Sequence, residues 1–523
     1  MERIATARPV IVGAGLGGLY AALALAPRPA LVISPEPLGE GASSAWAQGG
    51  VAAALAPPDA PEVHAADTCR AGAGLVDPAV AAAAAAEARG HVEALVRLGA
   101  PFDRTPDGGY VLSREAAHSF ARVARIGGDG AGAGIMRALV ARVRETPSIQ
   151  VLEGAEATGL RVSAGRVTGV EIAPARPGGP GPAAIEAPAV LLAAGGAGGL
   201  FALTTNPARI RGQAMGMAAL AGAAIADAEF VQFHPTALDV GFDPAPLATE
   251  ALRGEGAILV DRAGRRILEG LHPDLELAPR DVVARAVYAC AQAGGRPMLD
   301  ARAAVGARIE RAFPAVAAAC RRAGIDPVRE PIPVAAAAHY HMGGIETDAA
   351  GRSSLPGLWA CGEAASTGLH GANRLASNGL LEALVFGARC ARDIDAALGP
   401  AGPAPEVAVP RGGALPAPDP ALIARLRRAM TDGAGVVRDA PGLRRTLREI
   451  ARIEAEAPAC AALRPMTAAA TLIAAAALLR PESRGAHFRA ERPAPPPGEG
   501  RRSRLTLDRA REIREAALLE TAR

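Results

Sequence analysis

The chain contains nine histidines, and three glycine- or proline-rich segments hold four of them. His234 ends an apolar run, His339 and His341 flank a tyrosine, and His370 precedes a glycine. For each histidine alone, a hydrogen-bonded structural role is the simpler interpretation. The His-x-His pair lacks a third ligand at a suitable spacing, so the sequence does not favour a metal site.

Two arginines could recognise carboxylates. Arg280 follows a proline at the predicted start of a helix, and Arg374 lies among small residues in the segment 371–378. A guanidinium in such a place can make bidentate hydrogen bonds to a carboxylate, although a salt bridge would explain each residue equally well. Together with the histidines they would form a cationic pocket, which suits a small dicarboxylic acid.

The composition excludes several kinds of chemistry. All 56 basic residues are arginine, so Schiff-base, P-loop and kinase mechanisms that need a lysine are ruled out. The net charge of +3 and the 3% aromatic content argue against a nucleic-acid partner. The six cysteines form no CxxC motif, which favours a reduced, cytoplasmic protein. The apolar run 466–479 is too short to span a membrane, so no membrane association is expected.

A dinucleotide-binding turn is predicted near the start of the chain. An apolar run, 9–12, precedes glycine-rich residues and a helical segment, and a second apolar run follows at 30–34. This order indicates a βαβ unit whose helix N-terminus would hold a pyrophosphate. Glu36 could bind a ribose hydroxyl, or it could be a surface residue between two prolines. The residues of the turn are Gly13, Ala14, Gly15, Leu16, Gly17 and Gly18.

Further glycine-rich segments indicate one large cofactor bound by distant parts of the chain. Residues 43–50 are small apart from a tryptophan and a glutamine, and strands predicted at 189–192 and 358–360 both lead into glycines. FAD needs such distributed contacts more than NAD does. We therefore predict an α/β fold with an FAD-binding Rossmann-like domain formed by residues 1–232 and 343–400. An α+β capping domain at 233–342 would be inserted into it, and a helical domain at 415–523 would follow.

These motifs together resemble the flavoprotein superfamily of succinate dehydrogenase and fumarate reductase, and most closely its L-aspartate oxidase family. The resemblance covers nearly the whole chain and includes AQGG at 47–50, FHPT at 233–236, PRD at 279–281 and ESRGAH at 482–487. It implies that FAD is the cofactor. Besides the glycine turn, the implied FAD-binding residues are Ser34, Glu36, Ser43, Ser44, Ala47, Gln48, Gly49, Gly50, Glu363, Asn378, Gly379 and Leu380.

Two positions separate the branches of this superfamily. Members in membrane complexes attach FAD to a histidine five positions before the AQGG glutamine, where this chain has Ser43, so the resemblance implies noncovalent FAD. The segment 113–119 is similar to an oxidase segment whose glutamate faces the ammonium group of the substrate. Glu115 is therefore the residue expected to select an amino acid over a plain diacid.

The resemblance also implies roles for the polar residues. His234, His339 and Arg374 would bind the substrate carboxylates with help from Gln232 and Thr249, and Arg280 would transfer a proton. An arginine is a poor base because its pKa exceeds 12 in water, so its role could instead be electrostatic.

The implied reaction takes a hydride from L-aspartate to FAD and yields iminoaspartate for NAD biosynthesis. Oxygen or fumarate would reoxidise the cofactor, and quinolinate synthase is a possible partner.

Three positions depart from the superfamily pattern. Pro35 replaces a frequent flavin-contacting lysine, Gln213 replaces an aspartate, and Gly379 stands where a serine is common. These altered contacts leave open a noncatalytic FAD-binding protein. A second alternative is a soluble fumarate reductase or succinate-oxidising flavoprotein.

Overall fold

A five-stranded parallel sheet forms the centre of the computed structural model, which describes residues 2–412 and 417–519. Its strands are short apolar runs with both faces buried, as expected when helices cover a parallel sheet. The predicted βαβ unit is confirmed, since β2 and β3 pair in parallel on either side of α1. The strand order is β18 (Leu358–Ala360), β11 (Val190–Leu192), β2 (Val10–Val12), β3 (Ala30–Ser34) and β7 (Ile149–Glu153).

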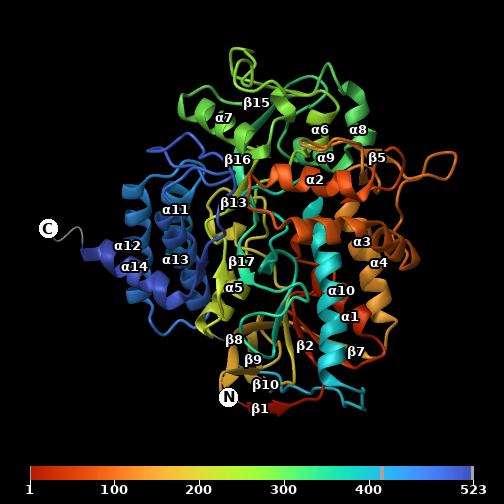
Figure 1. The fold of residues 1–523 in the computed structure, drawn as a ribbon, viewed down its shortest axis with the longest axis vertical. Coiled ribbons are helices and arrows are strands. Elements are labelled where there is room, and N and C mark those ends of the chain that lie inside the picture. The colour runs from red at the N-terminus through yellow and green to blue at the C-terminus, as the bar shows by residue number, and fades with distance from the viewer. Residues whose placement is uncertain (1, 413–416, 520–523) are drawn as a thin grey trace.

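Helices from distant parts of the chain cover this sheet (Figure 1). The long helix α10 runs along α1, and α10 also contacts α3 while α1 contacts α4. The Asp77 side chain caps α3 by accepting hydrogen bonds from the N–H groups of Ala79 and Val80. The helices are α1 (Leu16–Leu25), α2 (Pro61–Ala71), α3 (Pro78–Arg97), α4 (Ala131–Arg144) and α10 (Asn378–Leu398).

Three smaller sheets complete this part of the molecule. One has the order β1, β10, β9, β8, another β4, β6, β5, and the third β19, β17, β12, β20. Strand β20 comes from near the C-terminus and pairs with β12, so the last part of the chain joins a sheet built from its middle. The strands are β1 (Glu2–Ala5), β4 (Val51–Ala52), β5 (Leu112–Ser113), β6 (Val123–Ala124), β8 (Ala155–Ser163), β9 (Arg166–Pro174), β10 (Ala183–Glu186), β12 (Ile225–Ala226), β17 (Gly344–Glu346), β19 (Ala365–Ser366) and β20 (Arg504–Leu505).

The middle of the chain forms a layer of mixed strands and helices at the top of Figure 1. Its sheet has the order β13, β16, β15, β14, and β13 and β16 extend from it toward the parallel-sheet domain. This α+β unit lies between the two halves of the parallel-sheet domain in sequence. Its elements are β13 (Val231–Leu238), β14 (Ile258–Val260), β15 (Met298–Asp300), β16 (Ile332–His341), α6 (Ala251–Gly254), α7 (Arg280–Gln292), α8 (Ile309–Ala312) and α9 (Pro314–Arg322).

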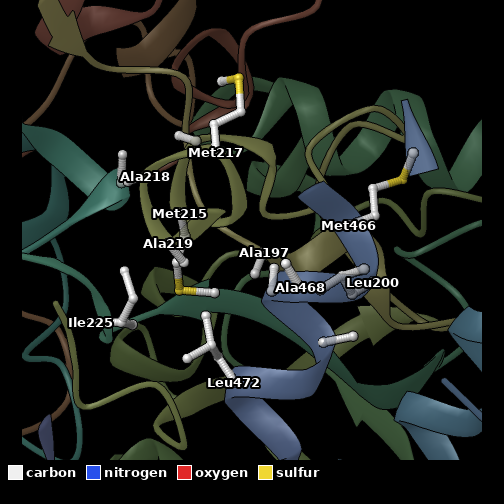
Figure 2. Close-up of a cluster of buried hydrophobic side chains, with 14 of the residues drawn as sticks. Ala197, Leu200, Met215, Met217, Ala218, Ala219, Ile225, Met466, Ala468 and Leu472 are labelled. Carbon is white, nitrogen blue, oxygen red and sulfur yellow. The ribbon is translucent and has the colours of Figure 1, made fainter. Parts of the chain in front are cut away.

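The C-terminal part consists mainly of helices that pack beside the sheets (Figure 1). Helix α13 is almost wholly buried because α11, α12, α14 and the earlier helix α5 surround it. Figure 2 shows the resulting contact, where Leu472 lies near Met215 and Ala468 lies near Ala197 within one buried cluster. Residues 415–416 and 520–523 of the predicted helical domain lie outside the described residues. The helices are α5 (Gln213–Leu220), α11 (Pro420–Ala434), α12 (Ala440–Glu456), α13 (Leu463–Leu479) and α14 (Leu507–Leu519).

The alanine-rich run at 466–479 is therefore a buried helix of the protein interior. Its small side chains permit close helix packing on several sides. Within residues 2–412 and 417–519, no helix combines the length and apolar character that crossing a membrane requires.

Gly216 permits the closest approach between α5 and the start of α13. A β-carbon at Gly216 would lie 1.9 Å from the carbonyl oxygen of Pro465, a distance at which the backbone must move. We predict that Gly216→Ala lowers the free energy of unfolding by about 1 to 3 kcal/mol, measured by denaturant unfolding.

The matched control is Gly90→Ala in α3, because Gly90 is exposed and has no neighbouring atom within 4 Å of an added β-carbon. This control should raise stability by about 0.5 to 1 kcal/mol, since alanine is the better helix former. Equal stability changes in the two variants would contradict the packing argument.

Candidate functional site

A cavity of about 680 Å³ lies between the carboxyl ends of the parallel strands and the middle layer. Because the strands are parallel, the segments that follow β2, β3, β11 and β18 all meet at this edge of the sheet. Most of the predicted FAD-binding residues line the cavity, namely Gly13, Ala14, Gly15, Leu16, Gly17, Ser34, Glu36, Ser43, Ser44, Ala47, Gln48, Gly49, Gly50, Glu363, Gly379 and Leu380. The site is thus assembled from the distant segments that the sequence singled out.

The glycine turn after β2 passes very close to the segment after β11. Gly13 has a φ of 110°, and a β-carbon there would lie 2.5 Å from the Ala193 carbonyl oxygen. Gly18 does not line the cavity, because it packs behind the turn, where a β-carbon would lie 2.0 Å from the Gly13 oxygen. The turn therefore leaves the N-terminus of α1 open to the cavity, as pyrophosphate binding requires.

Polar atoms in the cavity wall fit a bound dinucleotide. The Ser43 hydroxyl and Gln48 Oε1 are buried, and neither has a hydrogen-bond partner among the described residues. Gln48 Nε2 donates to the Leu247 carbonyl at 2.7 Å, which fixes the orientation of the amide. Asn378, by contrast, does not line the cavity, because its side chain is bonded to His64 and Thr68. Its predicted contact with FAD stays a prediction.

Gln232 joins the two predicted substrate arginines. Its Oε1 accepts hydrogen bonds from Arg280 Nη1 at 3.0 Å and from Arg374 Nη2 at 3.3 Å. Its Nε2 donates to Asn373 Oδ1 and to the Arg374 carbonyl, both at 2.9 Å. Gln232 is fully buried and does not line the cavity, so its amide holds the two guanidinium groups in place.

Arg374 is buried but still has a free donor. Its guanidinium lies 4.4 Å from the centre of the Tyr340 ring, and its Nε has no hydrogen-bond partner among the described residues. Burial, and then the nearby charge of Arg280, lower the pKa of Arg374 to about 10. It therefore remains a cation at neutral pH, able to bind a carboxylate.

His234 and His339 face the same end of the cavity, with ring centres 5.0 Å apart. Burial and nearby arginines hold the pKa of both rings well below the usual value, so both are neutral. His234 Nδ1 accepts from the N–H of Thr236 at 3.3 Å, which assigns the ring proton to Nε2. Because Nε2 is buried and has no partner among the described residues, it can donate to a substrate oxygen.

Glu115 brings a carboxylate into this cationic region. Its Oε2 accepts a hydrogen bond from the Ser377 hydroxyl at 2.9 Å, and Thr249 lines the cavity nearby. Burial, and then the negative charge of Glu250, raise the pKa of Glu115, whereas Arg280 opposes this shift. The positive charge of a substrate ammonium group would favour the ionised form of Glu115, because it offsets the loss of hydration that burial causes.

Glu250 is the residue whose role the sequence reasoning missed. Its Oε2 accepts a hydrogen bond from Arg280 Nε and lies 3.2 Å from Arg253 Nη2, while its Oε1 accepts from the Ala116 N–H at 2.7 Å. Burial alone would raise the pKa of Glu250, but the two arginines outweigh it and hold that pKa at about 2. The sequence signal that could have found this role is the spacing of Glu250 and Arg253, three residues apart and close to an apolar run.

The other two histidines singled out have structural partners. His341 Nε2 lies 2.9 Å from the Ala228 carbonyl oxygen, and His370 Nε2 lies 2.9 Å from Glu382 Oε2. Over the described ranges, no group of three or more histidine, cysteine, aspartate or glutamate side chains is arranged to hold a metal ion.

The chain matches known protein families and a known protein over most of its length. Residues 8–380 match the family described as FAD binding domain, and residues 423–504 match the family described as fumarate reductase flavoprotein C-term. An L-aspartate oxidase of Caulobacter vibrioides is 56% identical over 512 residues, which are 97% of each chain. The chain belongs to the L-aspartate oxidase family.

Other relatives agree with this family and its fold. An L-aspartate oxidase of Agrobacterium fabrum is 47% identical over 92% of this chain and 90% of its own. Among solved structures, a mutant FrdA of E. coli quinol fumarate reductase is 30% identical, with a TM-score of 0.84 over 94% of this chain and 92% of that chain. FAD is therefore the cofactor of this chain, and the contacts of Ser43 and Gln48 with it stay a prediction, although both residues line the cavity.

The neutralising role of Glu250 predicts a large loss of stability in Glu250→Gln. The change leaves two buried guanidinium groups without their anion, so the free energy of unfolding at pH 7 should fall by about 3 to 5 kcal/mol. The folded pKa of about 2 lies below the ordinary 4.5, so the stabilisation is complete above pH 4.5 and is lost as pH falls toward 2. The difference in the free energy of unfolding between variant and parent should therefore become smaller as the pH falls. Denaturant unfolding at several pH values measures this difference.

Glu255→Gln in the same segment is the control. Glu255 is 3.4 Å from Arg308, and both side chains are largely exposed, so its loss should cost less than about 1 kcal/mol. A Glu250→Gln protein as stable as this control would show that the buried ion pairs contribute little.

Proposed function

We propose that this protein oxidises L-aspartate to iminoaspartate with noncovalently bound FAD. The relatives at 56% and 47% identity carry the name L-aspartate oxidase, which supports this substrate. Ser43 supports noncovalent binding, because a hydroxyl offers no ring nitrogen to which the cofactor could be attached.

The position of Glu115 is the observation that carries the choice of substrate. The carboxylate lies in the same cavity wall as Arg280, Arg374 and two neutral histidines. The two arginines can bind two carboxylates, and Glu115 can bind one ammonium group. L-Aspartate has this set of charges, whereas succinate offers no cation for Glu115 to bind.

The chain's own residues would bind and orient the substrate. Arg374, His234 and His339 donate to the two carboxylates, while Gln232 keeps the two guanidinium groups in place. The substrate loses a hydride from its α-carbon and a proton from its nitrogen, and FAD supplies the two-electron acceptor. The middle layer covers the cavity and would exclude water from the reacting atoms.

Arg280 is assigned the proton transfer when fumarate is the electron acceptor. One olefinic carbon then takes a hydride and the other takes a proton, giving succinate. Arg280 lines the cavity, and Glu250 and Gln232 hold two of its nitrogen atoms. With these two nitrogen atoms held, the third nitrogen of the Arg280 guanidinium can donate to the substrate. The positive charge of the guanidinium also stabilises negative charge on the substrate.

Three wider proposals accompany this reaction. Oxygen or fumarate is the electron acceptor, iminoaspartate enters NAD biosynthesis, and quinolinate synthase is a partner that consumes it. The scattered cysteines favour a cytoplasmic location.

An anaerobic flavin-reduction assay tests the proposed substrate. The purified holoenzyme is mixed in turn with L-aspartate, D-aspartate, L-glutamate and succinate, and the flavin absorbance is followed. L-Aspartate should bleach the flavin fastest. Bleaching by succinate alone would identify a succinate-oxidising flavoprotein, and bleaching by none of the four would identify a noncatalytic FAD-binding protein.

Glu115→Gln should change the balance between two activities of the same site. Loss of a charge-assisted contact to the ammonium group should slow L-aspartate oxidation by about ten- to a hundred-fold. Reduction of fumarate by a reduced viologen dye should fall much less, because fumarate has no ammonium group.

Glu115→Asp is the matched control, since it retains the carboxylate and should recover part of the L-aspartate activity. The FAD content of both variants shows whether the cofactor site is intact. An equal loss in both activities would refute the role of Glu115 in selecting L-aspartate.

A further inference from the structure

Arg209 lies in the wall of the FAD cavity, yet no sequence motif singled it out. It belongs to the loop between β11 and α5, and its Nη1 is 3.0 Å from Oε1 of Glu36, which follows β3. Its Nη2 is 3.9 Å from Glu156 Oε2 on β8. The guanidinium therefore connects the ends of three separate chain segments beside the cofactor site.

The loop that carries Arg209 is held in one conformation. Gln213 Oε1 accepts from the Arg211 N–H at 2.8 Å, and Gln213 Nε2 donates to the Arg209 carbonyl at 2.7 Å. Ile210 rests against the glycine segment after β11, since a β-carbon at Gly195 would lie 3.2 Å from Ile210 Cγ2. These contacts hold the backbone from which the Arg209 side chain extends.

Glu36 indicates which part of FAD lies beside this guanidinium. In a βαβ dinucleotide site, the acid at the end of the second strand binds the ribose hydroxyls of the adenosine half. Glu36 lines the cavity at that position, and Arg209 is paired with it. The adenosine half would therefore lie within reach of the Arg209 side chain.

Arg209 retains the capacity to bind a ligand. Its Nη1 is shielded from water, and although Glu36 is near, no acceptor among the described residues forms an aligned hydrogen bond with that atom. A planar guanidinium can donate to ribose or phosphate oxygens and can also stack on a purine ring. Both kinds of contact suit adenosine diphosphate, the part of FAD that Glu36 indicates beside Arg209.

We propose that Arg209 binds the adenosine diphosphate half of FAD and that Gln213 is a positioning residue that orients it. This inference rests on FAD as the cofactor and not on L-aspartate as the substrate. It gives Gln213, one of the positions that departs from the superfamily pattern, a role through two backbone hydrogen bonds.

Titration of the apoprotein with FAD, ADP and FMN tests the proposal by calorimetry. Arg209→Ala should raise the Kd for both FAD and ADP about tenfold, whereas the Kd for FMN, which lacks the adenosine half, should stay unchanged. Arg211→Ala is the matched control, because it removes an arginine from the same loop that does not line the cavity. Its three Kd values should equal those of the parent.

A double-mutant cycle tests the positioning role of Gln213. Gln213→Ala should weaken ADP binding in the parent background but should cause no further loss in the Arg209→Ala background. An additive loss would show that Gln213 acts independently of Arg209 and would overturn its assignment as a positioning residue.

Two results would overturn the role of Arg209. One is an unchanged Kd for ADP and FAD in Arg209→Ala, and the other is an equal weakening of FMN binding. Thermal melting of each apoprotein reports on folding. If the alanine variant does not fold, Arg209→Lys keeps the charge beside Glu36 and should show the same selective loss of ADP binding. These titrations need no turnover, so a failure of L-aspartate oxidation would leave their outcome unaffected.

Discussion

The neutralisation of two buried guanidinium groups by Glu250 is the interaction on which the substrate end of the cavity depends. Removing charged groups from water costs several kcal/mol for each ion, so Arg253 and Arg280 could not both be buried without a nearby anion. The other oxygen of Glu250 accepts from the Ala116 N–H and so holds the segment that carries Glu115. One carboxylate thus sets the position of a cation and of the group proposed to select the substrate.

Ion pairs between arginine and aspartate play a similar part elsewhere in the molecule. Arg122 makes hydrogen bonds to Asp59 and Asp67, and Asp67 also accepts from the N–H of Ser119, close to Glu115. Near the C-terminus, Arg502 donates to the buried Asp227 at 2.6 Å and so connects the last segment to the FAD-binding part. The arginine content that excluded lysine chemistry therefore also joins parts of the chain that are distant in sequence.

The glycine turn and the strand at 30–34 were predictable because their signals are local. A short apolar run, a change to helical spacing and a glycine needed at positive φ all lie within a few neighbouring residues. The resemblance to the flavoprotein superfamily implied that Gln232 helps to bind the substrate, and the structure places its amide between Arg280 and Arg374. Reasoning from the residues alone could not separate His341 and His370, which have structural partners, from His234 and His339, which line the cavity, whereas the resemblance named only the latter two.

The sequence by itself determined the fold class, the FAD cofactor and the family, because glycine positions, strand periodicity and ordered motifs are properties of local segments. Only the tertiary structure decided which charges are buried together. Glu115 accepts from Ser377 although 262 positions separate them, and Arg209 meets Glu36 in the cavity wall. Such pairs form where packing removes water from groups that chain topology brings together, and no local pattern encodes that proximity.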